Sequence, residues 1–136
     1  MKTAGLLGGM SYESTIQYYK LINKKINNRL GNLNSAKILL YSFNFEEIEA
    51  LQRNGEWDKS GDLMGVQAKH LQDANADFIA ICTNTMHKLI DNINKHINID
   101  ILHISDAVGT EIKKHNLKNV LLLGTKFTME EDFYKK

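Results

Sequence analysis

The sequence predicts an α/β fold, a Rossmann-like three-layer sandwich built on a parallel sheet. Short apolar runs alternate along the chain with longer segments whose apolar residues recur every three or four positions. One run, residues 78–82, is apolar throughout, which is typical of a strand that is covered on both faces. Strands separated by helices pair in parallel through right-handed crossovers, and the helices then cover the sheet.

A glycine pair divides the first predicted strand from the first predicted helix. Residues 2–7 form a short apolar strand that enters a tight turn at Gly8 and Gly9. Ser11 is expected to begin a helix, and Gly31 is expected to end it. The face expected to pack on the sheet carries apolar side chains three or four positions apart: Tyr12, Ile16, Tyr19, Ile22, Ile26 and Leu30.

The next part of the chain repeats this alternation. Residues 36–42 form a second predicted strand, residues 45–53 a short helix and residues 57–75 a longer helix. Gly61 and Gly65 lie inside the longer helix, and we expect them to weaken it because glycine loses the most backbone entropy in a helix. The remaining predicted elements are a strand at 78–82, a helix at 86–97, a strand at 101–104, a helix capped by Ser105 or Asp106 and ending near residue 115, and a strand at 119–123.

The last segment carries a helix-start signal. Thr128 and Glu131 have the spacing of a capping box, in which a hydroxyl and a carboxylate satisfy the first free amides of a helix. This signal predicts a helix of several turns, although few residues follow it. The expectation is therefore a fold that continues beyond this segment, with a short, frayed terminal helix as the alternative.

Composition excludes several classes of function. The formal net charge is +1 and the basic residues are scattered, so we expect no nucleic-acid partner and no anionic membrane surface. No apolar stretch is long enough for a signal peptide or a membrane span. A single cysteine allows no intramolecular disulfide and suits a reducing compartment. These features predict a cytoplasmic location.

The glycine turn is the first candidate site, because ligands of open parallel sheets bind beyond the carboxyl ends of the strands. Gly8 and Gly9 do not complete a dinucleotide-binding motif, and no acidic residue ends the second strand to hold a ribose. The turn has two interpretations. Its amides, leading to Ser11, could bind a carboxylate, or it is a tight turn with no ligand.

The segment from Cys82 to Thr85 is the sharpest local signal. Cys82 ends a buried strand, and three small polar residues follow before a helix. A helix N-terminus would lower the pKa of the thiol and favour the thiolate, whereas a lone cysteine can also be inert core packing. His87 is expected to be packed or solvated, and the histidines share no spacing typical of a metal site.

Four motifs lie along the whole chain: GLLGGMSYEST at 5–15, LQRNGEWDKSGD at 51–62, CTNTMHK at 82–88 and LLGTKFTMEEDFY at 122–134. Together, and in this order, they resemble the aspartate/glutamate racemase family, and they are most similar to its aspartate racemase and broad-specificity amino-acid racemase branch.

The resemblance implies a cofactor-independent enzyme, without pyridoxal phosphate, whose active site lies between two similar α/β domains. Residues 1–100 would form the first domain, and residues 101–136 would begin the second. Two cysteines would face the α-carbon of an amino-acid or dicarboxylate substrate, one removing a proton and the other delivering one.

Carried over position by position, the resemblance makes Cys82 the first catalytic cysteine. The residues that it implies for substrate binding are Met10, Ser11, Gln52, Thr83, Asn84, Thr85 and Thr125.

This sequence also departs from the family pattern, since it has no Gly-Cys-Thr-Glu motif with a second cysteine. We therefore expect half of a two-cysteine site and little racemisation by this chain alone. An unfinished second domain would expose apolar surface and strand edges, which predicts a homodimer. The alternatives are an inactive module that binds small carboxylates or only self-associates, and a related reaction on a dicarboxylate or a hydantoin.

Overall fold

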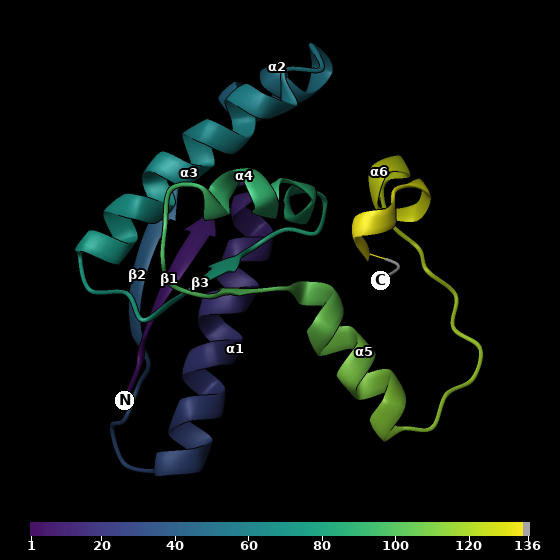
Figure 1. Ribbon diagram of the computed structural model, residues 1–136. Helices are drawn as coiled ribbons and strands as arrows, with labels where there is room; N and C mark the ends of the chain where they lie inside the picture. Colours follow the sequence, from purple (N-terminus) through teal and green to yellow (C-terminus); the bar gives the residue numbers. More distant parts are fainter. Residues whose placement is uncertain (135–136) are drawn as a thin grey trace.

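The computed structural model describes residues 1–134 and contains a four-stranded, wholly parallel sheet with the order β2-β1-β3-β4 (Figure 1). The predicted α/β fold class is confirmed. The strands are β1 (Thr3–Gly8), β2 (Lys37–Ser42), β3 (Phe78–Ile81) and β4 (Ile101–Leu102).

The register of the sheet brings the carboxyl ends of the strands to one edge. β1 lies between β2 and β3, with Gly8 opposite Ser42 and Leu7 opposite Ile81. Every strand therefore ends on the same side, and the segments that follow β1 and β3 leave the sheet at neighbouring points. This is the edge at which a ligand is expected in an open parallel sheet.

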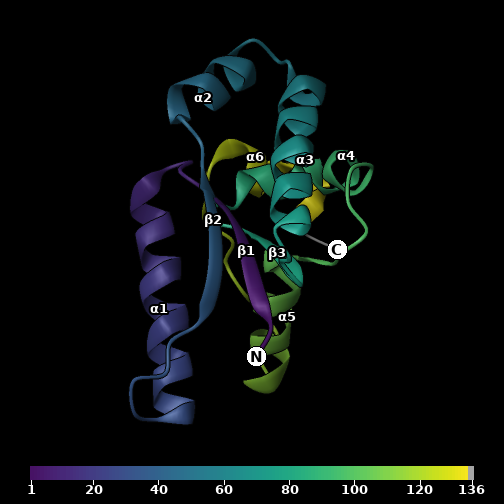
Figure 2. The same ribbon diagram turned by 90° about the vertical axis from the view of Figure 1, so that its left-hand side faces the viewer.

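Helix α1 (Tyr12–Leu30) covers one face of the sheet, with Ser11 as its N-cap and Gly31 as its C-cap, as predicted (Figure 2). The predicted buried stripe is largely wrong. Thr15 is the buried residue of α1, whereas Ile16 and Tyr19 are each 54% exposed. The first turn of α1 is hydrogen-bonded to the sheet edge through Ser14 and Thr15, and these bonds fix which side of the helix faces the sheet. The spacing of apolar residues in the sequence gives no information about such bonds.

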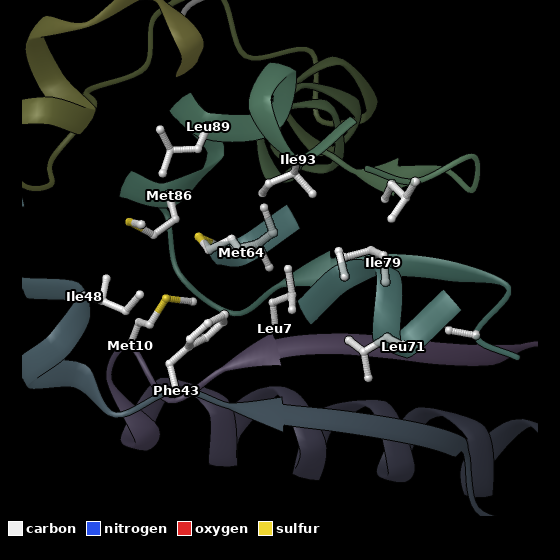
Figure 3. Close-up of a cluster of buried hydrophobic side chains, with 14 residues drawn as sticks. Leu7, Met10, Phe43, Ile48, Met64, Leu71, Ile79, Met86, Leu89 and Ile93 are labelled. Carbon is white, nitrogen blue, oxygen red and sulfur yellow. The ribbon is translucent and has the colours of Figure 1, made fainter. Parts of the chain in front are cut away.

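The main core lies on the opposite face, beneath α2 (Phe45–Arg53) and α3 (Trp57–Asp73). Figure 3 shows side chains from β1, β3, α2, α3 and the segment after β3 meeting there. A smaller cluster under α1 occupies the other face, so the sheet is the middle of three layers. Residues fully buried in the main core include Leu7, Ile48, Met64, Ile79 and Ile93.

Gly61 and Gly65 have a packing role that the sequence did not reveal. A Cβ at Gly61 would lie 2.6 Å from the Cβ of Asn92, and one at Gly65 would lie 2.2 Å from the Cδ2 of His96. These glycines let helix α4 (Ile90–Asn94) and the residues after it approach α3 closely. Their cost in helix propensity is offset by this contact.

The segment after β3 differs from the single helix predicted at 86–97. It forms a 3₁₀ helix, η1 (Thr85–Leu89), followed by the short α4. Helix α5 (Ile104–Lys114) begins after β4, and its N-cap is His103, not Ser105 or Asp106. The Nδ1 atom of His103 accepts a hydrogen bond from the backbone amide of Ser105 at 3.2 Å.

The predicted strand at 119–123 is wrong, because these residues form no strand and run extended between α5 and α6 (Figure 1). Leu121 is 82% exposed and Leu123 is 75% exposed. A parallel strand needs a neighbour to pair with, and residues 1–134 supply none at this position.

The predicted capping box at Thr128 is also wrong. Thr125 is the N-cap of α6 (Lys126–Glu130), and its hydroxyl accepts a hydrogen bond from the amide of Thr128 at 3.3 Å. α6 has five residues, and η2 (Asp132–Tyr134) follows it. Among residues 1–134, no helix has the length and apolar character needed to cross a bilayer.

Candidate active site

The glycine turn at the end of β1 is closed by hydrogen bonds. The Thr15 hydroxyl accepts from the Gly9 amide at 2.9 Å, and the Phe43 amide donates to the Gly8 carbonyl at 2.9 Å. Gly9 has φ +87°, and a Cβ there would lie 2.4 Å from the Phe43 carbonyl oxygen. Glycine is therefore required at this position. The Gly9 amide is already bonded, so of the two interpretations the structure favours a tight turn at this amide.

Cys82 lies directly after β3, and its side chain is buried under α1. Its residue exposure is 1%, and it packs in the small cluster with Leu6, Tyr18 and Ile22. Its amide donates to the Leu7 carbonyl at 2.9 Å, which continues the β1–β3 pairing for one more residue. The sheet therefore holds the cysteine rigidly.

Burial controls the protonation of this thiol. Desolvation raises the pKa of Cys82 to about 12, because the thiolate would lose its hydration. Of the two interpretations of Cys82, the free chain therefore fits the packed thiol and not a thiolate favoured by a helix N-terminus. The element after Cys82 is a five-residue 3₁₀ helix, which is too short to carry the dipole of a long α-helix.

Ser14 fixes the position of the cysteine, although the sequence analysis did not single it out. Its hydroxyl donates to the carbonyl of Cys82 across 68 residues of sequence. The first turn of α1 therefore makes two polar contacts with the sheet edge, through Ser14 and through Thr15. A serine and a threonine next to each other in a predicted helix give no local signal for such long-range bonds.

Two of the predicted substrate-binding residues meet across the edge. The Oγ1 atoms of Thr85 and Thr125 lie 3.0 Å apart, and the Thr125 Oγ1 lies 3.1 Å from the Thr128 Oγ1. Thr85 and Thr128 are buried, whereas Thr125 is exposed. This hydroxyl chain brings a segment from the end of the sequence to the turn that follows Cys82.

The two residues that continue from Cys82 differ in exposure, since Thr83 is half-buried and Asn84 is exposed. The amide of Asn84 is therefore open to solvent beside the hydroxyl chain. Ser11, at the start of α1, is half-buried and has no side-chain capping bond. These three side chains offer polar groups at the same edge as Cys82.

Met10 and Gln52 lie on the main-core side of this edge. Met10 is 4% exposed and packs near Ile48 and Phe43, so its side chain is part of the core (Figure 3). Gln52 is half-buried on α2, and its amide nitrogen lies 3.3 Å from the sulfur of Met86 in η1. Gln52 therefore borders the segment that carries Thr85, but Met10 exposes almost no side chain to a ligand.

His87 is a packed histidine, as expected. Its Nδ1 lies 3.1 Å from the Asn84 carbonyl oxygen, and its ring centroid lies 4.9 Å from that of His103. Burial, and next the charge of His103, lower the pKa of His87. Residues 1–134 contain no group of three acidic, histidine or cysteine side chains that could hold a metal ion.

Comparison with known proteins relates this chain to a protein family. The sequence model of the Asp/Glu/Hydantoin racemase family matches residues 7–136. The broad-specificity amino-acid racemase RacX of Bacillus subtilis (strain 168) is 27% identical over 135 residues, which are 97% of this chain and 58% of RacX.

Two crystal structures share the fold closely. A candidate Asp/Glu racemase from Yersinia pestis is 48% identical with a TM-score of 0.94, and an aspartate racemase homologue from Pyrococcus horikoshii OT3 is 36% identical with a TM-score of 0.86. Each match covers 98% of this chain and 58% of the other, so the chain spans little more than half the length of these relatives. The match to the family along nearly the whole sequence shows that this chain belongs to the Asp/Glu/hydantoin racemase family.

Proposed function

We propose that this chain contributes to a cofactor-independent amino-acid racemase that acts on aspartate or a related amino acid. The observation that carries the proposal is the position of Cys82 directly after β3, three residues before Thr85, whose hydroxyl lies 3.0 Å from that of Thr125, in a member of a racemase family. RacX is named a broad-specificity amino-acid racemase, and the Pyrococcus protein is described as an aspartate racemase homologue. Both descriptions support racemisation as the reaction class.

Racemisation needs proton transfer on both faces of the α-carbon. This chain contains one cysteine, so it supplies one of the two groups. Because burial raises the pKa of Cys82 to about 12, the side chain is a thiol at neutral pH. A thiol can donate a proton but cannot accept one, so Cys82 fits the role of proton donor in the free chain. Its role as a base would require a bound substrate or a partner group to lower that pKa.

The carbanion formed at the α-carbon must be stabilised, because the α-proton of an amino acid is a very weak acid and the carbanion is high in free energy in water. Hydroxyl and amide donors beside the cysteine support such a role: Thr83, Asn84, Thr85 and Thr125 can bind the carboxylate of the substrate. Ser11 and Gln52 border the same edge, and Met10 would contribute through its backbone. Donors held by the sheet and by η1 need little reorganisation when charge develops.

We also propose that residues 1–100 form one domain and residues 101–136 begin another. The distribution of buried apolar residues supports this division, since they lie between Ala4 and Ile97. A cytoplasmic location fits the free thiol.

We propose that the partner of this chain is a second copy of itself, and exposed apolar side chains support such a homodimer. α1 presents Tyr12, Ile16 and Tyr19 to solvent on one side, at exposures of 63%, 54% and 54%. Leu40 of the edge strand β2 is 46% exposed as well. A second copy of the chain would cover apolar side chains of this kind. Light scattering should report a dimer, and Ile16→Asp should shift it to a monomer without changing the circular dichroism spectrum.

Incubation with L-aspartate in deuterated buffer tests the enzymatic proposal directly. Loss of the α-proton signal by NMR, together with D-aspartate by chiral chromatography, is the expected result when the second proton-transfer group is present. Cys82→Ser is the matched control, since it keeps the size of the side chain but loses the thiol. Exchange that persists in Cys82→Ser would contradict the role of Cys82.

A second candidate function is an inactive module that binds small carboxylates. The full burial of the single thiol favours it, because a proton donor must reach its substrate. Thermal stabilisation by aspartate without α-proton exchange would support this candidate over the racemase. Turnover of a hydantoin or of maleate in place of aspartate would identify a related reaction on the same fold.

A further inference from the structure

A partly buried cation joins residues 127–131 to the segment after β3. The Nζ of Lys88 lies 2.8 Å from a carboxylate oxygen of Glu131 and 3.8 Å from the ring centroid of Trp57. The ring of Phe127 lies 5.2 Å from the same Nζ and packs edge-on against Trp57 at 5.0 Å. We call Lys88, Trp57, Phe127 and Glu131 the lysine cluster. It connects η1 and α3 with α6.

The lysine side chain is unusually enclosed for an ion pair. Its exposure is 17%, whereas the other lysines in ion pairs are between 44% and 78% exposed. A desolvated ammonium that keeps both a carboxylate and an aromatic face is worth more than an exposed pair. The contacts of Lys88 with Glu131 and Trp57 should therefore stabilise the lysine cluster more than an exposed ion pair would.

α6 is only five residues long, and within its own segment it is supported by the Thr125 cap and an exposed Lys126–Glu130 ion pair, so contacts with the rest of the fold matter for its position. The stretch that leads to it is exposed, and α5 has no buried residue. α6 touches the first hundred residues through two sets of side chains, the Thr85–Thr125 hydroxyl pair and the lysine cluster, while η2 contacts η1 beside them. The two sets lie on Thr85 and Lys88, which are one turn apart in η1.

We propose that Lys88 is a positioning residue that docks α6 onto η1 and so holds the Thr125 hydroxyl against Thr85, next to Cys82. The part of this inference that concerns a ligand rests on the proposed function. When α6 is docked, hydroxyl groups from distant parts of the sequence meet in the segment that follows Cys82. When α6 is released, Thr125 leaves and the donor set is incomplete.

The chain contains its own reporter of docking, because Trp57 is the single tryptophan and belongs to the cluster. Lys88→Met keeps an apolar side chain of similar length and removes the charge. We expect it to shift the emission of Trp57 and to speed hydrogen exchange at the amides of Met129 and Glu131, which bond within α6, by about tenfold. Lys88→Arg should restore both signals.

Lys59→Met is the matched control. Lys59 pairs with Glu56 near Trp57 in sequence, is 72% exposed and takes no part in the lysine cluster. This variant should leave the exchange of the α6 amides unchanged. High salt should speed that exchange in the wild type and have less effect in Lys88→Met, because the ion pair is the screened component.

The results separate the inference from the proposed function. Unchanged exchange and unchanged emission in Lys88→Met would overturn the docking role, whatever aspartate does. If docking is lost, weaker binding of L-aspartate by NMR titration, restored in Lys88→Arg, supports the positioning role, and an unchanged affinity overturns it. If the wild type binds no aspartate, the proposed function fails, and the exchange measurement still decides whether Lys88 docks α6.

Discussion

Residues 1–100 and residues 101–134 each contain a short apolar run, but only the run in the first region forms a buried strand. In the first region, the run at β3 is a strand whose Ile79 is fully buried. In the second region, the run at 120–123 is neither a strand nor buried, and its Leu121 is 82% exposed. Thr128 is the one buried residue among 101–134, and it is polar.

The difference lies in the neighbours that each run finds. β3 is flanked by β1 and β4, and it has the main core on one face and α1 on the other. Within residues 1–134, the run at 120–123 has neither strand partners nor covering helices. Apolar character is therefore a requirement for a buried strand and not a sufficient cause of one.

The largest effect should come from the turn that begins the first region. Gly9→Val places a branched side chain at φ +87°, where even a Cβ would lie 2.4 Å from a carbonyl oxygen. We expect a loss of about 4 kcal/mol or more in the free energy of unfolding, measured by urea denaturation. A variant as stable as the wild type would show that the turn is not tightly specified.

The two apolar runs themselves provide the next comparison. Ile79→Ala should cost about 3 kcal/mol, because it leaves a cavity between sheet and helix. Leu121→Ala, at 82% exposure, should change the free energy of unfolding by less than about 0.5 kcal/mol. Equal losses would mean that residues 120–123 are buried in solution, for example against a second copy.

The buried thiol gives the first region a dependence on alkaline pH. The pKa of Cys82 is about 12 in the folded chain and 9.0 for an ordinary thiol, so the unfolded chain loses its proton first as pH rises. The stabilisation is complete below pH 9 and is lost as pH rises toward 12, with about 3 kcal/mol gone by pH 11. Urea denaturation of Cys82→Ser across this range should lack that component of the slope.

The smallest effect should be a gain in the second region. Gly109 lies inside α5, and a Cβ there meets no atom within 4 Å. Gly109→Ala should raise the helix content measured by circular dichroism, with a stabilisation of α5 of about 0.5 to 1 kcal/mol. The same change at Gly65, where a Cβ would strike His96 at 2.2 Å, should destabilise the chain.

Local signals predicted most of the first region. The bounds of α1 follow from Ser11 and Gly31, and α2 has the predicted bounds, because caps and periodicity are encoded within one segment. The buried face of α1 could not be predicted, since it depends on bonds from Ser14 and Thr15 to residues far away or across a turn.

The candidate site could be predicted only in part, because it too depends on contacts between residues far apart in the sequence. The resemblance pointed to Cys82, Thr85 and Thr125, and the structure brings the two threonines to 3.0 Å. Of the two interpretations of Cys82, burial favours the packed thiol, because desolvation outweighs the effect of a short 3₁₀ helix on its pKa. Lys88 carried no signal in the sequence, since its partners at Trp57 and Glu131 are defined by folding alone.

The burial of Cys82 also determines how the chain withstands oxidants. Peroxides attack the thiolate and need access to the sulfur, and Cys82 is 1% exposed as a residue and protonated at neutral pH. The residue with the most reactive chemistry in the sequence is thus among the least vulnerable, so sulfenic acid should form only after the fold around β3 has opened. Oxidative damage to this thiol would then be a measure of unfolding, not of exposure time.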